Sequence, residues 1–466
     1  MSSEPVRKAP TELLRQLGVV SAVALVVSNM VGTGIFTSSG FLAGDLADPT
    51  LFFAIWIVGA VVSLAGAFCY SELGINYPSS GGEYVYLTQA YGPVWGFLTG
   101  WSSLFAGFSA PIAAAALAFS GYVAYFFPGL KQSLLTLGPS WFEVQIGGLQ
   151  VLAVLLIATL TLVNTLGTLR AARFQNVMTG LKITVLLTFI FMGLTMGNGN
   201  WSNLSQMTER TSTTPLFAQF GISLCFVYMS YSGWNAATYI AEELKAPART
   251  LPLALMIGTG MVAAIFLGMN LVFVYAAPLA EMRGVFAVGS FAASKLFGAG
   301  VAGVFSGAMA LSLVPTVNAM VTIGPRVYYA MARNGAFLSL AAYVDPKRHT
   351  PVAAILLQGG ISILMTFTPF PSLIQFIGMT LNFFAVMAVA SLFMFRRRDG
   401  WKRTGVVNFA WPLMPVVFIL AGTWMTIYGF IYSPVVSLSA TALMVVGAVV
   451  FHSRFRPAQT AMAAGD

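Results

Sequence analysis

Two short polar stretches interrupt long apolar runs of this chain, and they carry the chemistry that the sequence offers. The first reads Val31-Gly32-Thr33-Gly34-Ile35 and the second reads Tyr231-Ser232-Gly233-Trp234-Asn235. Glycine tolerates unwound backbone, so each stretch predicts a break in a helix. A break frees N–H groups at the positive start of one half-helix and carbonyls at the negative end of the other.

The freed backbone groups are suited to a ligand that carries both charges. N–H groups at a helix start bind a carboxylate, and freed carbonyls suit an ammonium. Unsatisfied backbone persists in lipid only where it lines a cavity or packs on protein. Paired interruptions in the two halves of a membrane chain indicate a transporter binding site for a zwitterion. Close helix packing through small residues is the alternative explanation of each glycine.

Composition places these stretches in a membrane protein. Apolar residues make up 58% of the 466 residues, charged residues only 8%, and the mean hydropathy is +0.82. Soluble proteins carry about a quarter charged residues, so most of this surface faces lipid. The net charge of +9 is spread over short loops, which excludes a nucleic-acid-binding patch. The two cysteines, Cys69 and Cys225, fall in apolar runs and are expected to be packing residues.

A spanning helix needs about 20 apolar residues, and the pattern predicts an all-α protein with twelve such helices. The first and sixth contain the two interruptions. The predicted ranges are 18–42, 50–75, 93–127, 146–166, 172–197, 214–240, 251–276, 297–333, 351–369, 372–395, 409–430 and 434–452.

Basic residues predict the orientation of these helices. Eighteen of the 23 lysines and arginines fall in loops on the side of the N-terminus, and four fall on the opposite side. Since basic loops face the cytoplasm, both termini are predicted to be cytoplasmic. One basic residue, Lys182, stands inside a predicted span, where an ionisable side chain is costly and points to function. A structural lysine that bonds loop carbonyls is the alternative.

Several stretches in one order resemble the L-type amino acid transporters of the amino acid/polyamine/organocation superfamily. Counterparts of several family motifs occur here. The family motifs are the signature G-S-G-I-F, the pair E-L-G and S-G-G-x-Y-x-Y, the pair G-W-N and E-E, R-x-Q with a following lysine, and the spacing of the eighth helix. These are Gly32-Thr33-Gly34-Ile35-Phe36, Ser71-Glu72-Leu73-Gly74 leading to Pro78–Tyr86, Gly233-Trp234-Asn235 with Glu242-Glu243, Arg173-Phe174-Gln175 with Lys182, and Leu311-Ser312 with Val317-Asn318 through Arg333-Asn334-Gly335.

The resemblance implies a LeuT-type fold of two inverted five-helix repeats followed by two C-terminal helices. The corresponding ranges are a cytoplasmic tail 1–17, a ten-helix core 18–395 with repeats about 18–197 and 214–395, helices 11 and 12 in 396–453, and a cytoplasmic tail 454–466.

The resemblance also implies where an amino acid would bind. The carboxylate is expected at the backbone of Gly32, Thr33, Gly34 and Ile35, and the ammonium at the carbonyls of Met30, Met229 and Ser232. Asn235 is expected to line the pocket. Tyr231 and Trp234 are gate or lining residues in this scheme, with packing as the alternative role for both. Lys182 is expected to bond the break in helix 1 and to replace a sodium ion.

The expected function is sodium-independent transport of amino acids, by exchange or proton coupling, across a bacterial inner membrane. Neutral L-amino acids are favoured because no Asp or Glu falls in the middle of a predicted span. A cationic amino acid or polyamine antiporter is the alternative, and a receptor or channel on the same fold is a third. The sequence has no H-E-x-x-H, G-x-S-x-G or Walker A motif, so no enzyme, catalytic residue, cofactor or metal site is expected.

Eukaryotic relatives of this kind join a heavy subunit through a cysteine between helices 3 and 4. The corresponding loop here, residues 128–145, contains no cysteine. The expected partners are therefore the amino acid and the lipid bilayer, without a disulfide-linked subunit and without nucleic acid.

Overall fold

The computed structural model describes residues 15, 17–79, 81–138, 144–166, 168–345 and 350–455. Within these ranges ten helical segments are long and apolar enough to cross a membrane, and the helices α9 (Leu216–Ser230) and α14 (Val352–Met365) are apolar but shorter. The expectation of a mostly helical multi-pass membrane protein is confirmed. The predicted tails at 1–17 and 454–466 lie almost wholly outside the described residues, and nothing is described of the Arg173-Phe174-Gln175 side chains.

The other α-helices cover most of the described chain. Their bounds are α1 (Val19–Met30), α2 (Thr33–Leu46), α3 (Pro49–Asn76), α4 (Glu83–Tyr91), α5 (Pro93–Ser102), α6 (Ala110–Val123), α7 (Gly148–Thr165), α8 (Thr168–Met196), α10 (Pro247–Ala276), α11 (Leu279–Met282), α12 (Val288–Phe297), α13 (Ala299–Arg333), α15 (Phe370–Phe395), α16 (Gly405–Phe409), α17 (Leu413–Tyr432) and α18 (Pro434–Val450).

Tighter or wider turns form six shorter helices. They are the π-helices η1 (Ser103–Ser109) and η6 (Phe451–Phe455) and the 3-10 helices η2 (Pro128–Lys131), η3 (Trp201–Ser205), η4 (Ala236–Glu243) and η5 (Ser339–Ala342).

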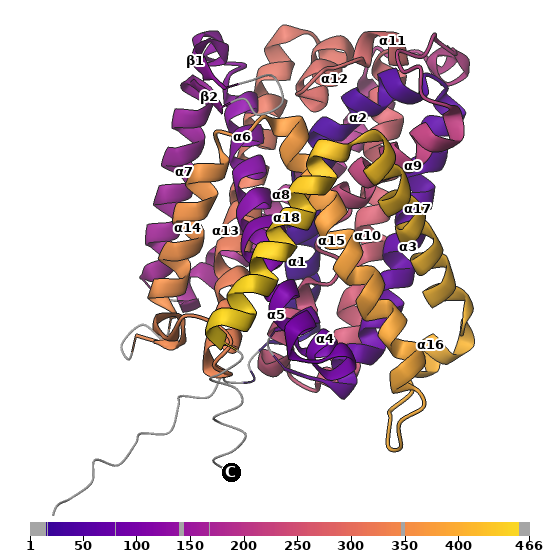
Figure 1. Cartoon of the computed structure of the whole chain (residues 1–466). Coiled ribbons are helices and arrows are strands. Elements are labelled where there is room, and N and C mark those ends of the chain that lie inside the picture. Colours follow the sequence, from indigo (N-terminus) through magenta and orange to yellow (C-terminus); the bar gives the residue numbers. More distant parts are fainter. Residues whose placement is uncertain are drawn as a thin grey trace, which may run out of the picture.

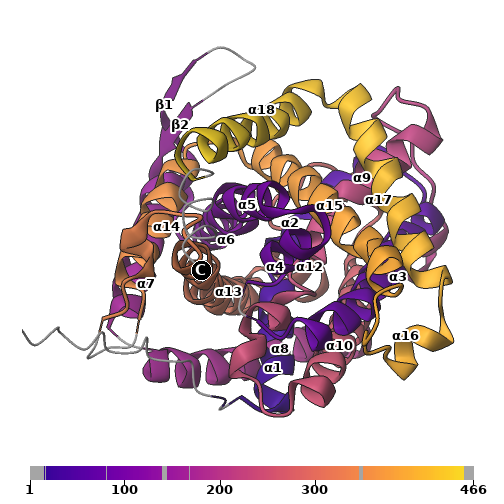
Figure 2. The same cartoon turned by 60° about the horizontal axis from the view of Figure 1, so that its bottom comes forward.

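The helices form a bundle with an inner set and an outer set (Figures 1 and 2). In the segment Pro93–Val123, 72% of the most apolar window is buried, against 28% for α17 and 22% for the α18 segment. The outer helices therefore present apolar side chains such as Phe191 and Leu420 to lipid. Inside the bundle, α1 packs on α10 and η4, while α2 packs on α9.

Neighbouring helices pair in a regular way. Helix α3 packs on α10, α6 on α13, and α7 on α14. Helix α8 contacts α1, α10 and α13, and α15 contacts α9, α3 and α6. These three contacts of α8 correspond to the three contacts of α15 if α1, α10 and α13 are matched with α9, α3 and α6.

The loops contain structure that the sequence did not predict. Helix α4 lies between the second and third spans, and α11 and α12 lie between α10 and α13. The strands β1 (Ser133–Leu137) and β2 (Val144–Gly147) pair antiparallel in the 128–145 region and at its edge. The prediction of an all-α chain is wrong in this detail, because a loop outside the apolar runs was not expected to form a hairpin.

A buried ion pair joins α3 to the chain that follows α15. The Arg396 guanidinium donates two hydrogen bonds to the Glu72 carboxylate, at 2.7 and 2.6 Å. The same carboxylate accepts a hydrogen bond of 2.8 Å from Trp401 Nε1. Both charged side chains are nearly inaccessible to solvent. A buried pair of this kind is costly to break because the remaining charge has no water around it.

We predict that Glu72→Gln lowers the free energy of unfolding by about 3 kcal/mol, the usual effect of breaking a buried pair. The matched control is Glu281→Gln, which breaks a half-exposed pair with Lys295 and should change stability by about 1 kcal/mol or less. Unfolding by SDS in mixed micelles, followed by circular dichroism, measures both. Equal effects of the two substitutions would show that the Glu72 pair contributes no more than a surface contact.

Candidate functional site

The first interruption separates α1 from α2. Helix α1 ends at Met30, Val31 and Gly32 leave the helical conformation (Val31 φ −75°, ψ 89°), and α2 starts at Thr33. The N–H groups of Thr33, Gly34 and Ile35 thus stand in the first turn of α2, where a helix has no internal acceptors for them. N–H groups at the start of a helix are suited to bind an anion.

Lys182 of α8 holds the carbonyl side of this break. Its Nζ donates hydrogen bonds to Val31 O at 2.6 Å, to Ser28 O at 3.3 Å and to Thr316 Oγ1 at 2.6 Å. Thr316 Oγ1 donates in turn to Val31 O at 2.8 Å. Among the described residues no carboxylate pairs with Lys182. The ammonium therefore rests on oxygens of the break and of α13.

The second interruption separates α9 from η4. The N–H groups of Tyr231 and Ser232 still donate to Val227 O and Met229 O, at 3.0 and 2.9 Å. Gly233 then adopts a φ of +101°, a conformation that residues with a Cβ rarely take. A Cβ there would also lie 2.8 Å from Asn29 Cβ of α1. Backbone conformation and close helix approach both require this glycine.

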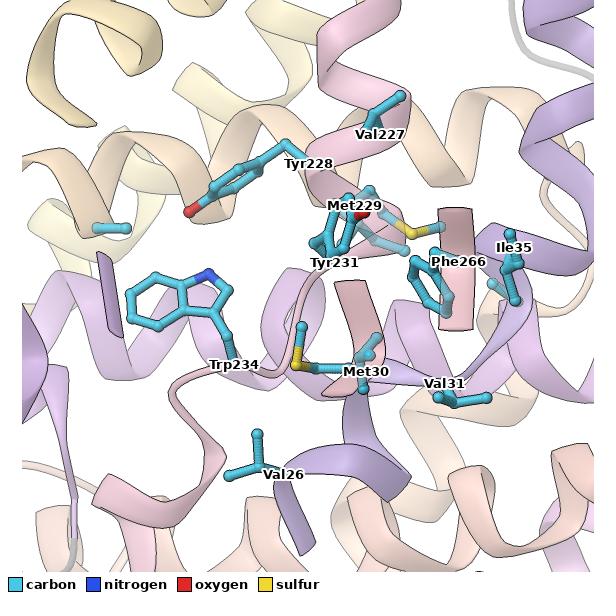
Figure 3. Packing of buried hydrophobic residues seen from close by; sticks show 14 of the residues in the cluster. Val26, Met30, Val31, Ile35, Val227, Tyr228, Met229, Tyr231, Trp234 and Phe266 are labelled. Atoms are coloured by element: carbon cyan, nitrogen blue, oxygen red, sulfur yellow. The ribbon is translucent and has the colours of Figure 1, made fainter. Parts of the chain in front are cut away.

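The two interruptions lie against each other. A Cβ on Gly34 would lie 2.2 Å from Ser230 Cα, so α2 passes directly over the end of α9. Ser230 Oγ also donates to Ser38 Oγ at 3.1 Å. In Figure 3, Met30 and Val31 of the first break lie below Met229 and Tyr231 of the second. The close packing that was the alternative explanation of Gly34 is therefore present at this residue.

One cavity lies between the two breaks. Eight of the residues expected at the site line it: Met30, Gly32, Thr33, Gly34, Met229, Ser232, Trp234 and Asn235. Ile35, Lys182 and Tyr231 are not part of the lining. Ile35 is fully buried, so only its backbone could serve a ligand. Lys182 contacts the break through Ser28 O and Val31 O without lining the cavity.

Of the two aromatic residues of the second break, only Trp234 lines the cavity. Its ring also packs edge-on against Tyr70, with centroids 4.7 Å apart. Tyr231 instead donates to Trp56 O at 3.2 Å. Its ring packs against Phe266 (Figure 3). Packing, the alternative role considered for both, describes Tyr231.

The sequence did not predict several lining residues, and the most important is Glu83. Its Oε1 accepts hydrogen bonds from Tyr70 Oη at 2.6 Å and from Asn235 Nδ2 at 2.9 Å. No Asp or Glu falls in the middle of a predicted span, but Glu83 reaches the pocket from α4, which lies between two spans. The position of Glu83 within the motif Pro78–Tyr86 was the only feature of the sequence that could have indicated a role at the site. The other additions come from the π-helix η1 and from neighbouring helices, and include Phe108, Tyr239, Thr316 and Met320.

At the end of η4, polar contacts join several segments of the bundle. Glu243 pairs with Arg326 of α13 at 3.2 Å, and Glu242 accepts a hydrogen bond from Ser79 Oγ at 3.1 Å. The backbone of Leu17 donates to Glu243 O at 3.0 Å. These contacts join the N-terminal segment, the α3–α4 connection and α13 to the end of η4.

Comparison with known proteins gives an independent result. Residues 17–451 match the family described as "Amino acid permease". The chain is 30% identical over 450 residues to "Large neutral amino acids transporter small subunit 2" of Homo sapiens, covering 94% of this chain and 80% of that protein. It is 28% identical over 454 residues to "b(0,+)-type amino acid transporter 1" of Mus musculus, covering 96% and 88%.

We predict that Gly34→Ala lowers both thermal stability and ligand binding, because the added methyl group cannot fit against Ser230. The control is Gly260→Ala in α10, where a Cβ would meet nothing within 4 Å. This control should gain up to about 1 kcal/mol from helix propensity. Thermal unfolding in detergent measures the stability of both variants. A Gly34→Ala protein as stable as the control would contradict the close approach of α2 and α9.

Proposed function

Because the chain belongs to the amino acid permease family, we propose that it is a sodium-independent secondary transporter that exchanges neutral L-amino acids. It is a multi-pass membrane transporter of amino acids and not an enzyme. The observation that carries the finer proposal is the pair of helix breaks that face one cavity. First-turn N–H groups of α2 would bind the carboxylate, and carbonyls of Met30, Met229 and Ser232 would bind the ammonium.

The helix contacts support the LeuT-type arrangement within this proposal. In two five-helix repeats, the second, third and fourth helices correspond to the seventh, eighth and ninth. These are the pairs α3 and α10, α6 and α13, and α7 and α14, which pack together. The contacts of α8 with the first, seventh and eighth helices also match those of α15 with the sixth, second and third. A two-fold repeat requires this correspondence.

The proposal includes twelve spans, with both termini on the cytoplasmic side of a bacterial inner membrane. The excess of basic residues in one set of loops supports this orientation. The core would cover 18–395, and helices 11 and 12 would cover 396–453. No disulfide-linked subunit is proposed, because the loop 128–145 contains no cysteine.

Lys182 is proposed to replace a sodium ion at the break of helix 1. A sodium ion at such a break would bind backbone carbonyls and hydroxyls, and the Lys182 ammonium bonds two carbonyls and one hydroxyl. The charge is part of the polypeptide, so the break is held open without a bound ion. Transport would then be driven by the gradients of the exchanged amino acids or by protons.

Transport of cationic amino acids is the second candidate function. The sequence placed it lower for lack of a carboxylate in the pocket, and Glu83 provides one. The cavity is thus compatible with a neutral substrate at the helix breaks and with a positive charge beside α4.

The first test is uptake of labelled L-leucine into proteoliposomes. We expect unlabelled L-leucine inside the vesicles to accelerate uptake several-fold, because a carrier returns faster when loaded, and we expect no change when choline replaces sodium. Uptake that internal leucine does not stimulate would contradict the proposed exchange. Uptake that requires sodium would contradict the role of Lys182.

The second test removes the charge of Lys182 and keeps its length. We expect Lys182→Met to weaken L-leucine binding by about 1–3 kcal/mol, the range for lost hydrogen bonds to a charged group, because the α1–α2 break loses its support. Leu181→Ala, a change at the neighbouring lipid-exposed residue, is the control. A Lys182→Met protein that binds and transports like this control would rule out the assignment.

A further inference from the structure

Glu83 is a buried acid without a basic partner. Its side chain is almost fully inaccessible, with 5% of the residue exposed. Within the described part of the chain, neither lysine, arginine nor histidine forms an ion pair with it. This differs from Glu72, the other fully buried glutamate described above, which pairs with Arg396. A carboxylate charge removed from water without a cation is unfavourable.

The groups that face Glu83 are neutral. Tyr70 of α3 and Asn235 donate to Oε1, and Tyr86, Tyr228 and Tyr239 are the other ionisable side chains around it. Tyrosine is uncharged at neutral pH. Burial raises the pKa of the Glu83 carboxyl, and hydrogen bonds from Tyr70, Asn235 and Tyr239 offset part of this rise. Burial without a cation therefore shifts the Glu83 carboxyl toward its protonated form relative to a carboxyl in water.

Glu83 also lies next to the break that would hold the substrate. Asn235 bonds it directly, and Ser232 and Gly233, just before Asn235, line the same cavity. The same lining contains the apolar side chains of Phe108, Met320 and Ile377. A side chain that extends from an amino acid held at the breaks would therefore meet both apolar side chains and one acid.

We propose that Glu83 lets the cavity accept cationic as well as neutral side chains. Its carboxyl keeps its proton while a neutral amino acid occupies the cavity. When the ammonium or guanidinium of a basic amino acid binds, the O–H bond of the carboxyl breaks, the proton passes to water in the cavity, and the carboxylate pairs with the cation. The proposal rests on the amino acid site described above and assigns one residue to its selectivity.

The proposal makes binding of a basic amino acid depend on pH. Below the raised pKa of Glu83 the cation must displace one proton, so affinity for L-lysine should rise by up to about tenfold per pH unit. Above that pKa the dependence should disappear. L-Leucine displaces no proton, so its affinity should not show this slope. Since both ligands carry the same α-amino and α-carboxyl groups, leucine corrects for titration of those groups.

The experiment measures binding of L-lysine and L-leucine to the purified full chain in detergent between pH 5.5 and 8.5. Proton release is followed with an indicator dye in weak buffer. We expect lysine to release protons at pH values below the raised pKa of Glu83, and leucine to release none. This comparison uses only the parent protein and does not depend on a variant that folds.

Variants then assign the effect to Glu83. In Glu83→Gln the ratio of lysine affinity to leucine affinity should fall at least tenfold, and the lysine-specific pH slope should vanish. Glu83→Asp should retain part of both, and Glu281→Gln, at an exposed acid, should change neither. If Glu83 had only a structural role, its substitution would lower the affinities for lysine and leucine by the same factor. The pH dependence of lysine binding would then remain.

The outcomes separate this inference from the proposed function. Leucine binding without lysine binding at any pH would overturn the role of Glu83 and leave the neutral transporter intact. Lysine binding without proton release would likewise overturn it. Failure of both ligands to bind would contradict the amino acid site itself.

Discussion

The structure depends on one constraint: backbone polar groups inside a bilayer must find partners within the protein. Two interrupted helices violate this rule locally, and their surroundings compensate for it. Val31 O receives both the Lys182 ammonium and the Thr316 hydroxyl, and Ser232 N–H still reaches Met229 O. Gly32, Thr33 and Gly34, at the start of α2, line a cavity. The protein thus supplies hydrogen-bond donors for the freed carbonyl of Val31 on the Lys182 side. On the cavity side, a ligand could supply the partners of the freed backbone groups.

The same constraint explains why the breaks touch. Each break must be covered by protein rather than lipid. Two breaks that pack on each other cover one another and need less additional protein, and glycines allow this close contact. Gly34 lies over Ser230, and Gly233 lies over Asn29. On one side of the breaks α2 packs on α9, and on the other α1 packs on η4. Each side is therefore a pair of half-helices. Two residues join α1 to α2 and five join α9 to η4.

Sequence reasoning succeeded where a physical rule acts along the chain. Apolar runs predicted the helices, and the Gly-rich stretches predicted that helices 1 and 6 break, since both features are local. It failed where the decisive contact is remote. The packing of Gly34 on Ser230 and the orientation of Tyr231 toward Trp56 depend on helices far apart in sequence. Helix α4 and the hairpin β1–β2 were missed because neither is long and apolar.

The two buried charges near the cavity show what remote contacts decide. Lys182 and Glu83 both come from positions whose sequence spacing says nothing about their partners. Lys182 donates to three oxygens of the protein, so each of its N–H groups has a partner within the fold. Glu83 accepts from neutral donors, which offset only part of the cost of burying a carboxylate. Among the described residues no cation pairs with Glu83, so the cation of a ligand could serve as its partner. Lys182, which supports the backbone, and Glu83, which would respond to the substrate, thus differ in one respect. The protein provides all partners of Lys182, whereas the partner of the Glu83 charge would come from the ligand.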